Sequence, residues 1–288
     1  MSRDVAAAGA LTGVPTGPGL RLAGVGYRYA GSGRPSLTDV GLTVLPGRVV
    51  GVVGANESGK TTLCLVASGL APASIGGRLE GSVRVDGIET AGQAPHRLAQ
   101  LCGMLFQNSL TQLSGATATV FEEVAFGPAN LGLPTAGVIE RVRWALGVVA
   151  IEGLASRDPA RLSDGQGQLV ALASVLALRP RYLILDEPTS ELDPAGTRLI
   201  AAALMRVAAE TGAGILLVEH KLDVLADIAD EVVVLDGGKV ALSGGSAEVL
   251  ADELLLGLGV EPPAGVRLER AVRSAGLEWS AEMADAIR

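Results

Sequence analysis

The stretch Gly54-Ala55-Asn56-Glu57-Ser58-Gly59-Lys60-Thr61 matches G-x-x-x-x-G-K-[ST], the pattern of a phosphate-binding loop. An apolar run, Val49 to Val53, precedes it, and an apolar helical stretch, Thr61 to Leu70, follows it. Strand, glycine loop and helix in this order are the context that the pattern requires. The glycines let backbone N–H groups point at phosphate oxygens, and the helix presents its positive end to them. The loop therefore predicts a site for a nucleoside triphosphate.

Three positions of this loop carry specific expectations. Lys60 is expected to reach the β- and γ-phosphates, and Thr61 to ligate Mg²⁺. Only three lysines occur in the whole chain, so a chance match to the pattern is rare, although a glycine-rich turn with a surface lysine is the plain alternative. Glu57 places a carboxylate in a loop meant for anions, so it is expected to weaken nucleotide binding unless it points outward.

A second motif ends an apolar strand further along the chain. The run Tyr182 to Leu185 is followed directly by Asp186 and Glu187. A carboxylate at a strand tip beside a phosphate loop suits a Mg²⁺ site, so Asp186 is assigned to the metal and Glu187 to the attacking water. A solvated strand end with two acids is the alternative, but together with the loop the pattern indicates a P-loop nucleotidase.

Further motifs, in chain order, make the chain resemble the ABC-type ATPases. Ser163-Asp164-Gly165-Gln166 resembles the LSGGQ signature of that family and stands at the family's spacing before Asp186. The other matching stretches are Tyr29 at the adenine-stacking position, Phe106-Gln107 at the Q-loop, Ser190-Glu191-Leu192-Asp193 at the D-loop and Val218-Glu219-His220 at the switch histidine. Two positions depart from the signature, because Asp164 replaces its first glycine and Leu169 its usual basic residue.

The resemblance implies a role for each matched residue. Those implied to bind ATP are Tyr29, Gly54, Ala55, Asn56, Glu57, Ser58, Gly59, Lys60, Thr61 and Thr62. Those implied for catalysis are Glu187, His220 and Lys60, and those for Mg²⁺ are Thr61, Gln107 and Asp186. Contacts to ATP held by the other subunit are implied for Ser163, Asp164, Gly165, Gln166 and Asp193. With one copy of each motif, the resemblance implies a dimer with a second ATPase subunit, either the chain itself or a paralogue.

A narrower resemblance covers the sequence after the Q-loop. The matching stretches are Gln107-Asn108, Thr111-Gln112-Leu113, Val120 to Pro134 and Glu219 to Asp223. They look like the ATPases of energy-coupling factor (ECF) importers, which take up vitamins or transition-metal ions. This resemblance implies an integral membrane coupling subunit, a separate solute-binding membrane subunit and a peripheral location at the cytoplasmic face of the cell membrane. The helical insertion after Gln107 is then expected to form the groove for coupling helices.

Composition limits the remaining possibilities. Of 288 residues, 48% are apolar and 19% charged, which is typical of a folded globular chain. A net charge of −8 without a basic run argues against a nucleic-acid partner. The cysteines, Cys64 and Cys102, fit neither a disulfide framework nor a zinc site, which favours a reducing compartment. The longest apolar run, Leu169 to Leu178, is too short to cross a membrane.

The expected fold class is α/β, an ABC-type P-loop nucleotide-binding domain with an antiparallel β subdomain and a helical subdomain. The predicted division is a flexible lead-in over residues 1–19, the ATP-binding domain over 20–250 and a C-terminal appendage over 251–288. Helical spacing of apolar residues runs from Thr119 to Leu178, and the resemblance implies a helical subdomain at about 107–178. Strands that alternate with helices after Tyr182 predict parallel βαβ units.

Two other functions remain open from the sequence. One is a soluble ABC-type ATPase that acts outside transport, although such proteins commonly carry two cassettes or basic arms that this chain lacks. The other is a poorly hydrolysing regulatory partner in a heterodimeric ATPase, which the departures at Glu57 and Asp164 suggest.

Overall fold

A computed structural model describes residues 17–279 and residue 283 of the chain. Most of the predicted N-terminal lead-in, residues 1–16, lies outside the described residues. No helix in the described part of the chain has the length and apolar character needed to cross a membrane.

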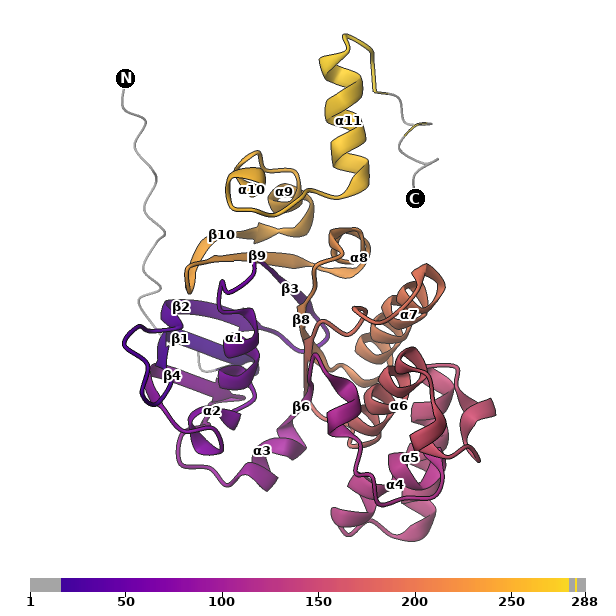
Figure 1. Cartoon of the computed structure of the whole chain (residues 1–288). Coiled ribbons are helices and arrows are strands. Elements are labelled where there is room, and N and C mark those ends of the chain that lie inside the picture. The colour runs from indigo at the N-terminus through magenta and orange to yellow at the C-terminus, as the bar shows by residue number, and fades with distance from the viewer. Residues whose placement is uncertain (1–16, 280–282, 284–288) are drawn as a thin grey trace.

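A six-stranded sheet forms the centre of the fold, in the order β10-β9-β3-β8-β7-β6 (Figure 1). The five strands from β9 to β6 pair in parallel, and β10 adds an antiparallel edge through a hairpin with β9. The bounds of the strands are β3 (Val49–Val53), β6 (Cys102–Leu105), β7 (Tyr182–Asp186), β8 (Gly214–Val218), β9 (Glu231–Asp236) and β10 (Lys239–Gly245). Their continuous apolar runs follow from burial on both faces of a parallel sheet.

A second, antiparallel sheet has the order β2-β1-β4-β5. Its strands are β1 (Leu20–Arg28), β2 (Leu37–Val44), β4 (Arg78–Val85) and β5 (Ile88–Glu89). A turn at Pro46-Gly47 leads from β2 into β3 of the other sheet, so these two consecutive strands form no hairpin. The β2 run pairs instead with β1, which precedes it in the chain.

A helical segment lies between β6 and β7 and packs beside α7 (Figure 1). Its helices are α4 (Val120–Asn130), α5 (Thr135–Val148) and α6 (Asp164–Ala177). Thr119 caps α4 and Ser163 caps α6, each in a capping box with the glutamate or glutamine three residues later. On α5, the indole nitrogen of Trp144 donates to Glu210 of α7 (Pro194–Thr211) at 3.0 Å, and Arg179 lies 5.3 Å from the Trp144 ring.

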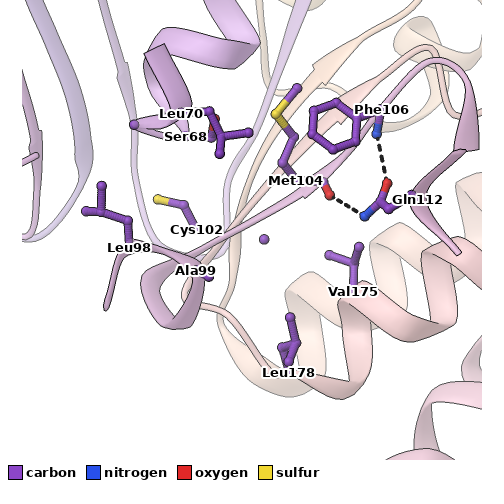
Figure 2. A pocket seen from close by; sticks show the side chains of 12 residues that line it. Ser68, Leu70, Leu98, Ala99, Cys102, Met104, Phe106, Gln112, Val175 and Leu178 are labelled. Atoms are coloured by element: carbon purple, nitrogen blue, oxygen red, sulfur yellow. Dashed lines mark hydrogen bonds between the residues drawn. The ribbon is translucent and has the colours of Figure 1, made fainter. Parts of the chain in front are cut away.

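An apolar groove of about 230 Å³ opens between this helical segment and the core (Figure 2). Its walls come from α6, β6, α3 (Pro95–Leu101) and the start of α2 (Leu70–Ala73). The main apolar side chains that line it are Leu70, Leu98, Met104, Phe106, Val175 and Leu178. At one side Gln112 donates to the Met104 carbonyl at 2.8 Å and accepts from the Phe106 N–H at 3.2 Å. The groove thus adjoins the segment that leads to Gln107.

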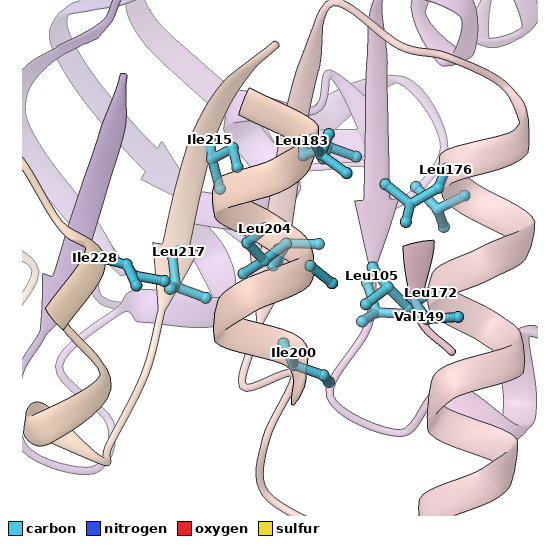
Figure 3. Packing of buried hydrophobic residues seen from close by; sticks show 14 of the residues in the cluster. Leu105, Val149, Leu172, Leu176, Leu183, Ile200, Leu204, Ile215, Leu217 and Ile228 are labelled. Atoms are coloured by element: carbon cyan, nitrogen blue, oxygen red, sulfur yellow. The ribbon is translucent and has the colours of Figure 1, made fainter. Parts of the chain in front are cut away.

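Alternate residues of the central strands enter two different cores. On one face, Leu183 of β7 and Leu217 of β8 pack with Leu204 of α7 and with side chains of α6 (Figure 3). On the other face, Ile184 and its neighbours pack with α1 (Lys60–Ala67) and the antiparallel sheet. Both cysteines are buried and unpaired, as core residues. The sheet is therefore held from both sides, which fixes the carboxyl ends of its strands.

The remaining elements are short or peripheral. They are η1 (Ser109–Gln112), η2 (Glu152–Leu154), η3 (Pro159–Arg161), α8 (Leu222–Ile228), α9 (Ser246–Leu250), α10 (Leu254–Gly257) and α11 (Ala264–Ser274). In Figure 1, α11 projects away from the sheets. The chain before it stays on the core, because Val260 is buried and the Ala264 N–H donates to Asp223 at 2.8 Å.

Candidate active site

A polar cavity of about 720 Å³ lies over the phosphate loop and the carboxyl end of the sheet. Its lining comes from the loop and α1, from residues 32–36 after β1, from the ends of β6 and β7, and from the β9–β10 turn. The lining residues are Ser32, Arg34, Pro35, Ser36, Asn56, Glu57, Gly59, Lys60, Thr61, Thr62, Gln107, Glu187, Gly237 and Gly238. The lining thus includes predicted residues of the loop, Gln107 at the Q-loop position and Glu187, the second of the paired acids.

Close packing explains the glycines of the loop. A Cβ on Gly54 would lie 2.3 Å from the Leu235 carbonyl oxygen, and one on Gly59 would lie 2.8 Å from that of Ser36. Gly59 also has φ 103, in the region that favours glycine. Only glycine therefore lets the loop run close against both neighbouring segments.

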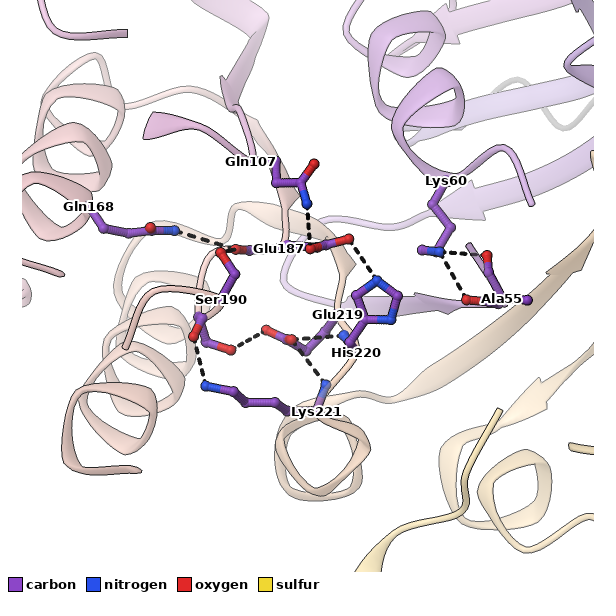
Figure 4. A network of polar contacts seen from close by, with 11 residues as sticks. Ala55, Lys60, Gln107, Gln168, Glu187, Ser190, Glu219, His220 and Lys221 are labelled. Carbon is purple, nitrogen blue, oxygen red and sulfur yellow. Dashed lines mark hydrogen bonds and ion pairs between the residues drawn. The ribbon is translucent and has the colours of Figure 1, made fainter. Parts of the chain in front are cut away.

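Lys60 is buried and bonds to its own loop. Its ammonium donates to the carbonyls of Gly54 and Ala55, both at 2.9 Å (Figure 4). Burial lowers the pKa of Lys60, while the nearby carboxylates of Glu187 and Asp186 act in the opposite sense. The ammonium lies beside the cavity, where phosphate oxygens can replace the two carbonyls.

Asp186 presents an unpaired oxygen at the predicted metal position. Its side chain is 1% exposed, and its Oδ1 atom is buried without a hydrogen-bond partner. Burial raises the pKa of Asp186, and a hydrogen bond with Thr61 counters this rise. An orphaned carboxylate oxygen beside a hydroxyl suits Mg²⁺, which prefers oxygen ligands and takes few from the protein when it binds phosphates. The residues present therefore fit the ion.

Glu187 is held from two sides. Its Oε2 atom accepts from the Gln107 amide nitrogen at 2.8 Å, and its Oε1 atom lies 2.8 Å from Nε2 of His220 (Figure 4). The residue has φ 53, and its N–H donates to the Val218 carbonyl at 3.0 Å. The Gln107 amide oxygen remains available for a cation. A carboxylate in this position can orient a water molecule or accept its proton.

The signature residues lie outside the cavity. Ser163 and Gln166 are occupied with each other in the capping box of α6, through two bonds of 3.3 Å. Asp164 is exposed, and a Cβ on Gly165 would lie 3.0 Å from the Leu192 side chain. Asp193 is exposed and caps α7 through the Gly196 N–H at 2.7 Å. Their role towards a nucleotide on another subunit stays a prediction.

Tyr29 also lies beside the cavity rather than in its lining. Its hydroxyl shares a hydrogen bond of 3.1 Å with Thr62, and its ring meets that of Tyr27 edge to face at 5.0 Å. The stacking of Tyr29 on adenine stays a prediction.

Glu57 is exposed, and its backbone has φ 64. It lines the cavity, but its exposed side chain is not enclosed among the phosphate-binding groups. Its carboxylate is therefore at the solvent-exposed rim of the cavity, and a weakening effect on nucleotide binding stays a prediction.

Several lining residues were not predicted from the sequence. Ser32, Arg34 and Ser36 follow β1 without a recognisable motif. Gly237 and Gly238 form the turn between β9 and β10, and a Cβ on Gly238 would lie 2.5 Å from the Ser36 carbonyl oxygen. The glycine pair was the available signal, because adjacent glycines mark close backbone approach as well as turns.

Fold and site together define a P-loop nucleoside triphosphatase: a phosphate loop after a central parallel strand, with paired acids at the tip of another strand of the same sheet. The family described as ABC transporter matches residues 37–190. The chain belongs to this family.

Individual relatives agree with this assignment. A putative ABC transporter ATP-binding protein of Pyrococcus abyssi is 40% identical over 254 residues, which cover 88% of this chain and 90% of that protein. The energy-coupling factor transporter ATP-binding protein EcfA1 of Lactiplantibacillus plantarum is 38% identical over 260 residues, or 89% of each protein.

Solved structures confirm the predicted fold class. The structure of cbiO1 from Clostridium perfringens, part of the ABC transporter complex cbiONQ, has a TM-score of 0.74 at 30% identity and covers 90% of this chain and 98% of that one. The cassette MJ0796, solved as a dimer with ADP and Pi after hydrolysis, has a TM-score of 0.69 at 25% identity and covers 79% of this chain and 98% of that one. The chain is an ATP-binding subunit of the ABC transporter type, and ABC ATPases hydrolyse ATP as dimers and couple hydrolysis to transport.

Proposed function

We propose that this chain energises an ECF-type importer of a vitamin or a transition-metal ion from the cytoplasmic face of the cell membrane. The observation that carries the hydrolytic part is Glu187, held between Gln107 and His220 at the edge of the nucleotide cavity. The observation that supports the ECF assignment is the similarity to EcfA1 and cbiO1 along nearly the whole chain.

ATP binds with its phosphates on the loop from Gly54 to Thr62. Backbone N–H groups and the positive end of α1 face the phosphates, and Lys60 exchanges its loop carbonyls for phosphate oxygens. Tyr29 supplies an aromatic face for adenine. Thr61, Gln107 and Asp186 would hold Mg²⁺, which neutralises phosphate charge when it is bound.

Hydrolysis uses the pair formed by Glu187 and His220. Phosphoryl transfer needs little covalent help from the protein, so positioning and charge provide most of the catalysis. Glu187 orients the attacking water and accepts its proton. His220 contacts the γ-phosphate and leaves its present contact with Glu187, so that the carboxylate becomes free to act on water.

The exposed signature completes the site of a second subunit. The N-terminus of α6, with Ser163, Asp164, Gly165 and Gln166, faces the γ-phosphate on the other subunit, and Asp193 approaches it from the D-loop. This placement would explain why these five residues do not line the nucleotide cavity of their own subunit. Closure of the dimer around ATP then provides the mechanical stroke.

The apolar groove beside the Q-loop receives a coupling helix of an integral membrane subunit. Leu70, Phe106 and Leu178 give it the apolar walls that an amphipathic helix fits. Gln112 ties the groove wall to the backbone at Phe106, directly before Gln107, so a shift of the docked helix reaches the residue that holds Glu187. A separate membrane subunit binds the solute, and no nucleic acid takes part.

Capture from membranes tests this proposal. The tagged chain is extracted gently with and without ATP, and mass spectrometry identifies its companions. We expect an integral membrane scaffold, a small solute-binding membrane protein and the second ATPase subunit, which also shows whether the dimer holds two copies of this chain. Recovery from the soluble fraction with ribosomal or DNA-associated proteins would contradict the transport role.

A poorly hydrolysing subunit is a second candidate, because Asp164 adds a negative charge at the helix end that is assigned to the γ-phosphate. Single-turnover hydrolysis by the isolated chain and by mixed dimers separates the two. A chain that binds ATP without turnover in both settings would support the second candidate.

A further inference from the structure

Two charged residues flank the switch histidine and reach away from the nucleotide. Glu219 and Lys221 stand on either side of His220, directly after β8. Glu219 is 2% exposed, and Lys221 is half-buried. Both side chains point towards the segment of residues 189–193 that follows Glu187 (Figure 4). Neither has a role in the nucleotide cavity.

Lys221 uses all three of its donors on one region. Its ammonium donates to the Thr189 carbonyl at 2.7 Å, to the Leu192 carbonyl at 3.0 Å and to the Thr197 hydroxyl at 3.0 Å. A lysine ammonium has three N–H donors, so this set is complete. The lysine therefore binds both ends of the 189–192 turn and the first turn of α7 at once.

Glu219 binds the same turn through the side-chain hydroxyl of Thr189. One carboxylate oxygen accepts from the Thr189 hydroxyl at 2.6 Å. The other accepts from the backbone N–H groups of His220 and Lys221, at 2.8 and 3.1 Å. The carboxylate thus fixes the backbone that carries His220 and, through Thr189, fastens it to the 189–193 segment.

The fastened segment leads to the groups assigned to the partner's nucleotide. Leu192 packs close to the signature glycine, since a Cβ on Gly165 would lie 3.0 Å from its side chain. Asp193 follows it directly and caps α7. The turn itself has two backbone bonds, from Ser190 to Glu187 at 3.2 Å and from Leu192 to Thr189 at 3.1 Å. The hydrogen bonds from Glu219 and Lys221 therefore connect this turn to the residues that follow β8.

We propose that Glu219 and Lys221 are positioning residues that fasten the D-loop to the switch histidine, so that His220 and Asp193 reach their hydrolytic positions together. This inference rests on the proposed ATPase function and deepens it. Contact of His220 with its own nucleotide is then transmitted to the residue that faces the nucleotide of the other subunit. Glu219 and Lys221 both bond to Thr189, and Lys221 also bonds to Leu192 and Thr197.

Lys221→Met is the direct test, with Lys239→Met as its matched control. Lys239 is an exposed lysine at the start of β10, so the control removes the same charge by the same substitution. We expect Lys221→Met to keep the ATP affinity of the isolated chain, measured by calorimetry. Its kcat should fall about tenfold or more, since charged hydrogen bonds of this kind are lost. Lys239→Met should match the wild type in both.

Association provides a readout that a purely structural role would not move selectively. In the Glu187→Gln background, which removes turnover, ATP-driven association should weaken when Lys221→Met is added while the ATP affinity stays unchanged. Thr197→Val, which removes one of the three acceptors, serves where Lys221→Met does not fold. It should lower kcat by a smaller factor while the ATP affinity stays unchanged.

Wild-type kcat and association in Lys221→Met would overturn the inference, and so would wild-type kcat in Thr197→Val if only that variant folds. An equal loss of ATP affinity and kcat would also overturn it, because it would show a general defect of the site. Failure of the proposed function gives a different result, in which the wild-type chain itself lacks ATP turnover or membrane companions.

Discussion

The Nε2 atom of His220 lies 2.8 Å from Oε1 of Glu187, while Gln107 binds the other carboxylate oxygen at the same distance. The predicted base is thus engaged by Gln107, which is assigned to Mg²⁺, and by His220, which is assigned to the γ-phosphate. Before it can act on water, at least one of these contacts has to be exchanged, which connects the chemical step to the arrival of nucleotide.

Replacing Glu187 with Gln should separate binding from chemistry. Glutamine keeps the shape and can still bond to Gln107 and His220, but it cannot accept a proton. We expect ATP-driven association to persist and kcat to fall about 100-fold or more, the usual contribution of a general base. Steady-state ATPase assays check this, with Glu140→Gln on the surface of α5 as control. Near-wild-type turnover would remove Glu187 from the assigned role.

Replacing Glu57 with Gly should raise ATP affinity modestly. Glycine relieves a positive φ of 64 and removes a negative charge from the cavity rim. The effect should be about twofold to fivefold, as expected for a solvent-screened charge. Glu57→Gln separates the two causes, since it removes only the charge. An unchanged or weaker Kd in calorimetry with Glu57→Gly would show the side chain to be harmless or useful.

Asp186→Asn should stabilise the nucleotide-free chain and abolish turnover. Because burial raises the pKa of Asp186, its charged form costs stability above the folded-state pKa, and this cost vanishes below the unfolded-state pKa. We expect Tm to rise by a few degrees at neutral pH, by about 2–4 °C for each kcal/mol relieved in a domain of this kind. The gain should shrink as the pH is lowered. A lower Tm at neutral pH would contradict this account.

A charge in the apolar groove should release the membrane subunit. Leu70→Glu places a carboxylate among Leu98 and Met104, where a docked apolar helix cannot satisfy it. Capture from membranes should lose the integral membrane scaffold, while the ATP affinity of the isolated chain stays the same. Leu268→Glu on the exposed face of α11 is the control. Equal recovery of the scaffold with Leu70→Glu would place the coupling contact elsewhere.

The sequence predicted the elements that carry the site with nearly their observed bounds. The apolar run Val49 to Val53 is β3, and the strand expected to end at Leu185 extends only one residue further, to Asp186. These runs are readable because strands buried on both faces are continuously apolar and end where the polar site begins.

Pairing between distant segments could not be predicted in the same way. The turn at Pro46-Gly47 is a local signal, whereas the choice of β1 as the partner of β2 depends on which face each strand buries. Likewise, Arg34 and Gly238 line the same cavity although they are about 200 residues apart in the chain. The contacts of Lys221 to Thr189 and Leu192 join residues without any shared periodicity, so only the folded chain shows them.

The bond between Trp144 and Glu210 gives the chain an optical reporter of its own motion. Trp144 is on α5 of the helical segment, and its partner is on α7 of the core. The emission of an indole depends on its hydrogen bond and on charge near its ring, and here Glu210 and Arg179 supply both. With only one other tryptophan in the chain, Trp279→Phe leaves Trp144 as a single intrinsic fluorophore. Any rotation of the helical segment against the core that breaks this bond will shift its emission without an attached dye.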